Sequence, residues 1–94
     1  MKFHNKLFVI EAWRWLFNLA QEDDPVWIKD ALGIWPGIGG IVFEPEHPQG
    51  PRICIATDSG VMIVEPGDWI VRYEDGKLYS CKSDIFDKTY EECK

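Results

Sequence analysis

Residues 57–82, TDSGVMIVEPGDWIVRYEDGKLYSCK, decide the fold. Residues 61–64 are apolar on both faces, and residues 69–73 alternate at the two-residue period that is typical of a β-strand. Between these strands, Pro66-Gly67 predicts a type II turn, because proline presets φ at the first central position and glycine accepts the positive φ of the second. The chain is therefore expected to reverse at this point.

Asp75-Gly76 predicts a hairpin with a primed turn, because both residues tolerate the positive φ that such turns require. A third strand, residues 77–82, is expected to pair back on the second. Upstream, residues 52–58 form another strand, and a tight connection at residues 58–60 leads from it into the next. A short apolar run at residues 41–43 is also typical of a strand.

The N-terminal residues 7–15 are rich in Phe, Val, Ile and Trp, which favours a strand. One face of this strand would carry Phe8, Ile10 and Ala12. The other would carry Val9, Glu11, Trp13 and Trp15. A mixed face of the second kind is typical of a domain edge or an interface. Residues 11–21 also contain good helix formers at i, i+3 and i+4 spacing, so a helix is the alternative there.

A helix is expected after a polar break in the chain. Asp24 is a candidate cap, Pro25 suits the first helical position, and Gly33 ends the helix. The segment covers about two turns, which is too short to be stable alone. It is therefore expected to dock Trp27 and Ile28 on the sheet.

A second helix is expected near the C terminus. Ser83 is a candidate cap, and the carboxylate of Asp84 favours the helix dipole at the first position. One stripe of this helix would carry Ile85, Phe86, Thr89 and Tyr90. A single turn followed by an extended tail is the alternative for residues 83–94.

These elements predict an α+β fold. The chain has 94 residues, of which 46% are apolar, and this is enough for the core of a single domain over residues 1–94. The glycine- and proline-rich residues 33–50 lack both GxGxxG and GxxxxGK[ST], so they indicate turns and bulges rather than a phosphate loop. The prediction is a mainly antiparallel, curved sheet of about five strands with one or two short helices packed on it.

Composition limits the function classes. The net charge of −6 opposes the neutralisation of phosphate, so duplex nucleic acid is not an expected partner. The apolar run near the N terminus is cut short by Glu11 and Arg14, so neither a signal peptide nor a membrane span is expected. The chain has three cysteines without CxxC spacing, Cys54, Cys81 and Cys93. They predict neither a disulfide framework nor a zinc site, which favours a reducing, cytoplasmic location.

No pattern of residues along the chain strongly indicates a catalytic site. His4 and His47 show no HxH or HxxxH spacing, so neither a metal centre nor a cofactor is expected. Cys81 would need a base and an electropositive site to act as a nucleophile, and no histidine is placed to help it. A paired-carboxylate hydrolase stays open, although acids beside turns and helix starts are usually caps. The acids concerned are Glu65, Asp68, Asp84 and Asp87.

Charged, aromatic and thiol side chains gather near the hairpin, and they are the candidate binding residues: Asp68, Trp69, Arg72, Tyr79, Cys81, Lys82 and Asp84. The hairpin is expected to place Arg72 and Lys82 on neighbouring elements close to aromatic rings. Cation and ring together would hold a small anionic or planar ligand, or an acidic loop of a partner protein. The structural alternative is a turn cap at Asp68, a core anchor at Trp69, and a salt bridge from Arg72 to Asp84.

Three segments carry a resemblance to a known family: VIEAWRW at 9–15, PVWIKDALG at 25–33, and GVMIVEPGDWIVRYEDGKLYSCKSDIFDKTYEE at 60–92. They resemble a family of small uncharacterised phage and prophage proteins that begin with a basic stretch ending in VIEAxxW and close with PGDW/Y-I-I-R-G, YPCKPDIF and TYE segments. Tyr73 stands where the family usually has Gly, and Ser80 and Ser83 stand where it usually has Pro. His4-Asn5 interrupts the basic start. The resemblance implies a phage or prophage origin and supplies no catalytic residue.

The expected function is therefore non-enzymatic. A small phage accessory protein would bind a host protein or a small ligand, as a counter-defence or host-takeover factor. A ligand pocket between two copies in a homodimer is plausible, because a small domain forms deep pockets more easily between copies than within one. Two alternatives stay open: a small nucleotide-directed hydrolase, and a minor virion or packaging-associated component.

Overall fold

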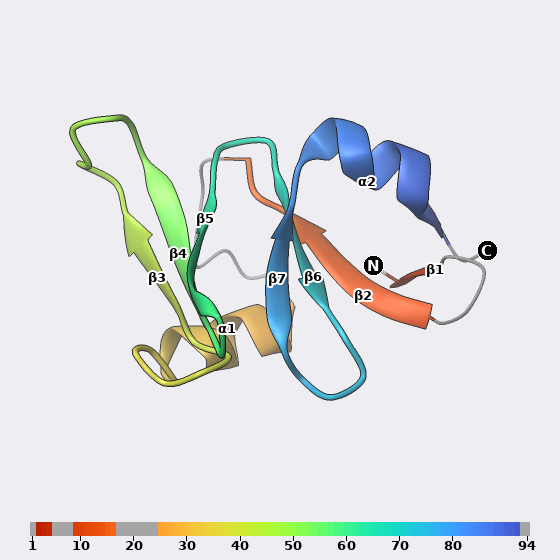
Figure 1. The fold of residues 1–94 in the computed structure, drawn as a ribbon, viewed down its shortest axis with the longest axis horizontal. Coiled ribbons are helices and arrows are strands. Elements are labelled where there is room, and N and C mark those ends of the chain that lie inside the picture. Colours follow the sequence, from red (N-terminus) through yellow and green to blue (C-terminus); the bar gives the residue numbers. More distant parts are fainter. Residues whose placement is uncertain (1, 5–8, 17–24, 93–94) are drawn as a thin grey trace.

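The structure, a computed structural model, describes residues 2–4, 9–16 and 25–92 (Figure 1). These residues form eight strands and two helices. The strands are β1 Lys2–His4, β2 Val9–Arg14, β3 Ile41–Glu44, β4 Arg52–Thr57, β5 Gly60–Val64, β6 Trp69–Arg72, β7 Leu78–Cys81 and β8 Glu91–Glu92. The helices are α1 Val26–Leu32 and α2 Ser83–Thr89.

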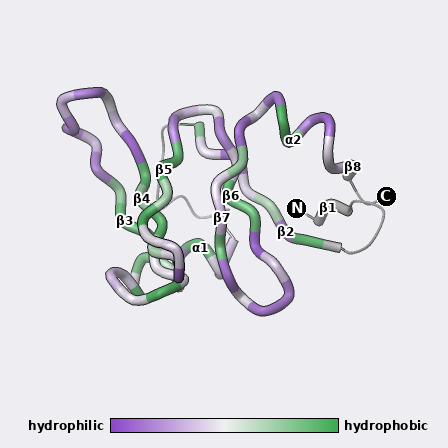
Figure 2. Tube along the Cα trace, viewed as in Figure 1, coloured by the Kyte–Doolittle hydropathy of each residue, from purple (hydrophilic) through white to green (hydrophobic). Residues whose placement is uncertain are grey.

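The strands form two antiparallel sheets, one of five strands in the order β7-β6-β2-β1-β8 and one of three strands in the order β3-β4-β5. The predicted α+β class, with antiparallel strands and short helices, is confirmed. The expected curved sheet is divided in two, and side chains from both sheets share one core. Hydrophobic residues follow the strands of both sheets, whereas the loops between β3 and β4 and between β6 and β7 are hydrophilic (Figure 2).

The Pro66-Gly67 turn joins the two sheets and does not close a hairpin. Gly67 has a φ of 93°, as the predicted type II turn requires at its second central position. The strands on either side do not pair, because β5 bonds to β4 while β6 bonds to β2 and β7. Gly67 N–H donates to the carbonyl of Trp15 at 2.7 Å, so the end of β2 holds this turn in place.

The hairpin between β6 and β7 is confirmed, but its turn is longer than expected. Tyr73 N–H donates to the carbonyl of Lys77 at 3.1 Å, and Gly76 N–H donates to the carbonyl of Tyr73 at 2.9 Å. Gly76 has a φ of 85°. The turn is thus a three-residue loop with glycine in the left-handed region, rather than a two-residue primed turn at Asp75-Gly76.

The N-terminal strand is confirmed, and it lies inside the five-stranded sheet between β6 and β1. The helix alternative is wrong as far as Arg14, and residues 17–21 lie outside the described residues. Both faces of β2 are covered, because Ile10 and Ala12 are buried under α2 while Trp15 is buried between the two sheets. The mixed face therefore lines a core and does not lie at an edge.

Helix α1 begins one residue later than predicted. Pro25 is its N-cap, and the candidate cap Asp24 lies outside the described residues. Gly33 ends the helix as predicted. The helix docks by two buried side chains, Ile28 and Ala31, with Trp27 packed beside them against the core between the sheets.

Residues 83–89 form helix α2, so the predicted second helix is confirmed over the single turn with an extended tail. Lys82 is the N-cap and Ser83 is the first helical residue, so the predicted cap at Ser83 is wrong by one position. Of the predicted stripe, Phe86 is buried and Tyr90 is half-buried. The exposed members are Ile85 and Thr89. α2 thus covers the outer face of the five-stranded sheet mainly through Phe86.

Candidate functional site

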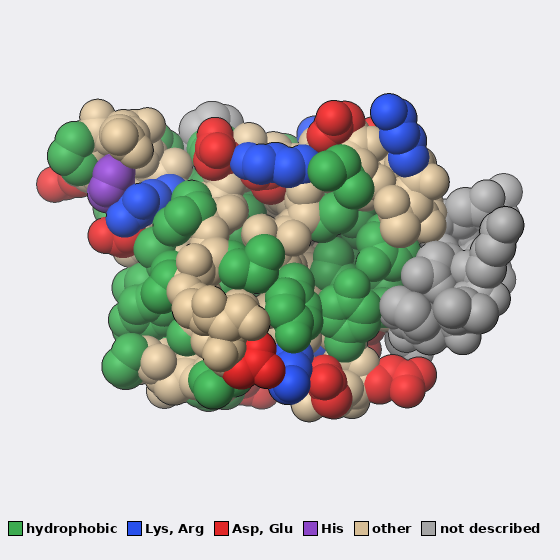
Figure 3. Space-filling model, in the orientation of Figure 1, with side chains coloured by type: hydrophobic (Ala, Val, Ile, Leu, Met, Phe, Trp, Pro, Cys, Tyr) green, Lys and Arg blue, Asp and Glu red, His purple; other side chains and the backbone are tan. Residues whose placement is uncertain are grey.

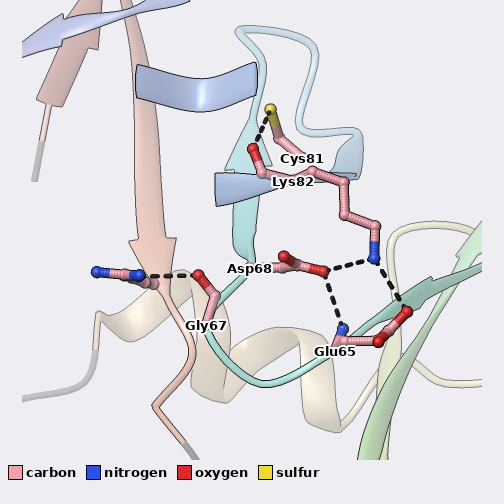
Figure 4. Close-up of polar contacts among 6 residues, drawn as sticks. Glu65, Gly67, Asp68, Cys81 and Lys82 are labelled. Atoms are coloured by element: carbon pink, nitrogen blue, oxygen red, sulfur yellow. Dashed lines mark hydrogen bonds and ion pairs between the residues drawn. The ribbon is translucent and has the colours of Figure 1, made fainter. Parts of the chain in front are cut away.

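A buried carboxylate organises the turn between β5 and β6. Asp68 is 8% exposed, and its Oδ2 accepts the backbone N–H of Glu65 at 3.3 Å and Lys82 Nζ at 2.9 Å. Lys82 Nζ also donates to Glu65 Oε1 at 3.0 Å, so one ammonium bridges two carboxylates (Figure 4). The hydrogen bond to Asp68, and then that to Glu65, raises the pKa of Lys82. Asp68 therefore caps the turn as the structural alternative predicted.

Arg14 adds contacts that the sequence did not predict. Its Nε donates to the carbonyl of Gly67 at 2.8 Å, and its Nη2 donates to Ser83 Oγ at 3.3 Å. Arg14 stands at the end of β2, 53 residues before Gly67, so no local pattern could signal these bonds. They tie the β5–β6 turn to the first residue of α2.

Trp69 and Cys81 are register partners across the β6–β7 ladder. The ring of Trp69 stacks on Phe86 with centroids 4.0 Å apart and an interplanar angle of 6°, so Trp69 anchors the core beneath α2. Burial first, and then the carboxylates of Asp68 and Asp84, raise the pKa of Cys81. A thiol with a raised pKa is mostly protonated at neutral pH and is therefore a weak nucleophile.

Arg72 is the last residue of β6, at the opposite end of the strand from the β5–β6 turn. Its Nη1 is 3.7 Å from Glu11 Oε1, so the predicted salt bridge to Asp84 is wrong. Arg72 is three residues beyond Trp69, roughly 10 Å along the strand, whereas Lys82 lies beside the β5–β6 turn. Arg72 and Lys82 thus stand on neighbouring elements, as expected, but the β6–β7 register places them at opposite ends of the hairpin.

The remaining two candidates, Tyr79 and Asp84, lie apart from the β5–β6 turn. The ring of Tyr79 meets that of Tyr73 edge-on, with centroids 5.4 Å apart, near the β6–β7 turn. Asp84 is exposed in the first turn of α2. The structure thus brings Asp68, Lys82 and Glu65 into direct contact, and it distributes the other candidates along the hairpin and α2. Ligand binding by this set stays a prediction.

A second polar cluster lies on the three-stranded sheet. The buried thiol of Cys54 donates to Glu44 Oε1 at 2.9 Å, and Arg52 Nε donates to the same oxygen at 2.9 Å. Burial, followed by the hydrogen bond to Glu44, raises the pKa of Cys54 to about 11. The bond from Cys54, followed by that from Arg52, lowers the pKa of Glu44. Sequence spacing gave no signal for this cluster, because its members meet only through the β3–β4 register.

The outer face of the three-stranded sheet is apolar. Because side chains alternate along a strand, Ile53, Ile55 and Val64 enter the core while their neighbours face outward. We call the outward apolar set the outer-sheet patch: Val42, Cys54, Ala56, Val61 and Ile63. Val61 is 59% exposed and Ile63 is 37% exposed, whereas Cys54 and Ala56 form a buried floor. Figure 3 shows hydrophobic side chains spread over this side of the molecule between charged upper and lower margins.

An open groove adjoins the outer-sheet patch at Ile63. It has a volume of about 510 Å³ and lies between the β3–β4 loop and the β5–β6 turn. Its apolar lining includes Ile63 and Pro66, and its polar lining includes His47, Arg52 and Glu65. His47 Nδ1 accepts the backbone N–H of Gln49 at 3.2 Å, which fixes the ring against the β3–β4 loop.

Comparison of the chain with protein-family models, curated proteins and solved structures finds no match. Among residues 2–4, 9–16 and 25–92, no group of three or more His, Cys, Asp or Glu side chains could hold a metal ion. No helix in the described part of the chain is long and apolar enough to cross a bilayer.

Proposed function

We propose that this chain is a non-enzymatic binding domain of a phage or prophage, and that it attaches to a host protein through the outer-sheet patch. The observation that carries the proposal is the exposure of Val61 and Ile63, which stand side by side in β5 on the outer face of a sheet. Exposed apolar side chains that gather on one face are typical of a protein interaction site.

The two outer sheet faces differ, and this difference supports the proposal. On the five-stranded sheet, Phe86 of α2 covers Ile10, Ala12 and Val71 in a second core. On the three-stranded sheet, α1 packs inward on the core, and α2 lies over the other sheet. Within the described ranges, Val61 and Ile63 of the outer-sheet patch are therefore left exposed above the buried floor of Cys54 and Ala56, where a partner protein would cover them.

The chemistry of the polar clusters also favours binding over catalysis. Burial raises the pKa of both Cys54 and Cys81, which disfavours the thiolate that a nucleophile needs. Asp68 and Lys82 bond to each other at 2.9 Å and so act as a structural pair at the turn. The groove beside Ile63 would receive a side chain of the partner at the rim of the interface.

An affinity experiment tests this proposal. Wild-type protein, Val61→Asp and Ile85→Asp are each immobilised and exposed to the same bacterial lysate, and the retained proteins are quantified by mass spectrometry. Ile85 is 54% exposed on α2, so Ile85→Asp is a matched control for adding a charge to an exposed apolar position. We expect one or more proteins to be retained by the wild type and by Ile85→Asp and lost from Val61→Asp. Equal retention by all three would contradict the proposal.

A further inference from the structure

Strands β5 and β7 lie side by side but belong to different sheets (Figure 1). An ion pair joins Lys77 Nζ to Asp58 Oδ2 at 3.1 Å, just before both strands begin. A second ion pair joins Lys82 Nζ to Glu65 Oε1 at 3.0 Å, just after both strands end. The two strands therefore run in the same direction. We call the boundary between them the seam.

The hydrogen-bond pattern of β4 fixes which backbone groups of β5 face the seam. Ala56 N–H donates to the carbonyl of Gly40 at 2.9 Å, and the carbonyl of Ala56 accepts Gly39 N–H at 2.9 Å. Both groups of Ala56 thus point away from β5. Ala56 is opposite Val61, and bonded and non-bonded pairs alternate in an antiparallel ladder. The backbone N–H and C=O of Val61 and Ile63 therefore face the seam.

The backbone groups of β7 alternate in the same way. The bond from Tyr73 N–H to the carbonyl of Lys77 marks a bonded pair at the turn. By alternation, Tyr79 and Cys81 bond to β6, and the backbone groups of Leu78 and Ser80 point toward the seam. In the part of the chain that the structure describes, no backbone hydrogen bond crosses the seam between β5 and β7.

We propose that the seam accepts an extended peptide segment of the partner protein, which runs antiparallel to both β5 and β7. This inference rests on the proposed function and names how the partner is recognised. The segment would bond to Val61 and Ile63 on one side and to Leu78 and Ser80 on the other. The two sheets would then become one continuous sheet.

The occupant follows from the groups that the seam presents. Alternate residues of each strand offer one N–H and one C=O, spaced by roughly 7 Å, which is the spacing of another strand. Natural edge strands are usually blocked by lysine, proline or a bulge. The β5 sequence GVMIV contains neither lysine nor proline, and its outward Val61 and Ile63 would contact apolar side chains of the segment.

Opening the seam breaks the two ion pairs at its ends and moves β5 relative to β7, and Val64 of β5 and Leu78 of β7 are both buried in the shared core. The side chains of Lys77 and Asp58 are 43% and 48% exposed, and those of Lys82 and Glu65 are 52% and 66% exposed. Ion pairs at such exposure contribute little to stability because water and salt screen them. The seam is therefore weakly closed at both ends, while each strand stays bonded within its own sheet.

The test uses ten-residue peptides selected from a random display library on the wild-type protein. Ile63→Pro removes an N–H that faces the seam and leaves the bonds from β5 to β4 intact. Ile63→Ala is the matched control, because it also loses most of the side chain but keeps the N–H. We expect Ile63→Pro to weaken peptide binding at least about tenfold relative to Ile63→Ala, because backbone bonds carry strand addition. Equal affinities, or a library that yields no binder, would overturn the proposal.

Amide hydrogen exchange on the wild-type protein provides a second measurement, which does not depend on the folding of a variant. Bound peptide is expected to slow exchange at Val61, Ile63, Leu78 and Ser80, whereas exchange at Met62 changes little. Peptides that lose affinity with Val61→Asp but bind Ile63→Pro and Ile63→Ala equally would refute strand insertion. They would leave the proposed function intact, since the outer-sheet patch would still be the contact surface.

Discussion

Replacing Phe86 by Ala is expected to lower the free energy of unfolding by about 3–5 kcal/mol. Phe86 is 2% exposed, stacks on Trp69 at 4.0 Å and contacts the ring of Tyr90 at 5.0 Å. The loss combines the transfer free energy of the ring, the cavity left behind, and about 0.5–1.5 kcal/mol for the aromatic contacts. Since α2 has seven residues and is too short to be stable alone, it would undock.

Urea unfolding followed by far-UV circular dichroism measures this change, with the wild-type slope used to check that the transition stays two-state. Ile85→Ala is the matched control. Ile85 precedes Phe86 in α2 and is 54% exposed, so this substitution should change the free energy of unfolding by less than about 0.5 kcal/mol. Should Phe86→Ala prove too unstable to measure, Phe86→Leu is expected to cost about 1–2 kcal/mol. Equal losses in the free energy of unfolding for Ile85→Ala and Phe86→Ala would refute the docking of α2 through Phe86.

Two further predictions concern the polar clusters. Because the pKa of Cys54 is raised to about 11, alkylation of Cys54 by iodoacetamide in the folded protein should be slow at neutral pH and should accelerate toward that pKa. Glu44→Gln should lower the pKa of Cys54 and speed the reaction, as measured by peptide mass spectrometry; an unchanged rate would contradict the role of Glu44. Lys82→Met should destabilise the protein by less than about 1 kcal/mol, because this side chain is 52% exposed. The pKa of Lys82 in the folded protein is raised above 10.5. The stabilisation by its ion pairs should therefore be complete below pH 10.5 and lost as the pH rises through the folded pKa. A stability difference between wild type and Lys82→Met that persists above that pKa would count against the ion pair.

Local sequence patterns predicted the positions of strands and turns better than they predicted which strands pair with each other. The alternation in residues 69–73 and the glycine in each turn were enough to place β6, β7 and the hairpin between them. The same patterns could not reveal that β6 pairs with β2, because that register joins Ala12 to Val71 across a long stretch of chain. The short strands β1 and β8 were not predicted, since two or three residues carry no periodic signal.

The candidate site shows the same limit. The turn cap at Asp68 was predicted because aspartate beside a turn commonly bonds the local backbone. Its partner Lys82 lay within the predicted set, since the hairpin register brings residue 82 back to the turn. The bonds of Arg14 and the Cys54–Glu44 contact depend on tertiary pairing, and no spacing in the sequence marks them.

The outer-sheet patch could be identified only after the sheets were known. Residues 61–64 are apolar at every position, a pattern that indicates a strand buried on both faces. The structure instead leaves Val61 and Ile63 exposed at the edge of a three-stranded sheet. This conflict between pattern and burial is the physical reason to assign a partner to β5.

Amide hydrogen exchange of the free protein, resolved by residue with NMR, tests this account most directly. The amides of Met62 and Val64 bond to β4 and should be strongly protected, whereas those of Val61 and Ile63 face the seam and should exchange close to the rates of an unfolded chain. Protection of Val61 and Ile63 equal to that of Met62 would mean that the seam is already closed by the chain itself. That result would contradict a binding role for the edge of β5.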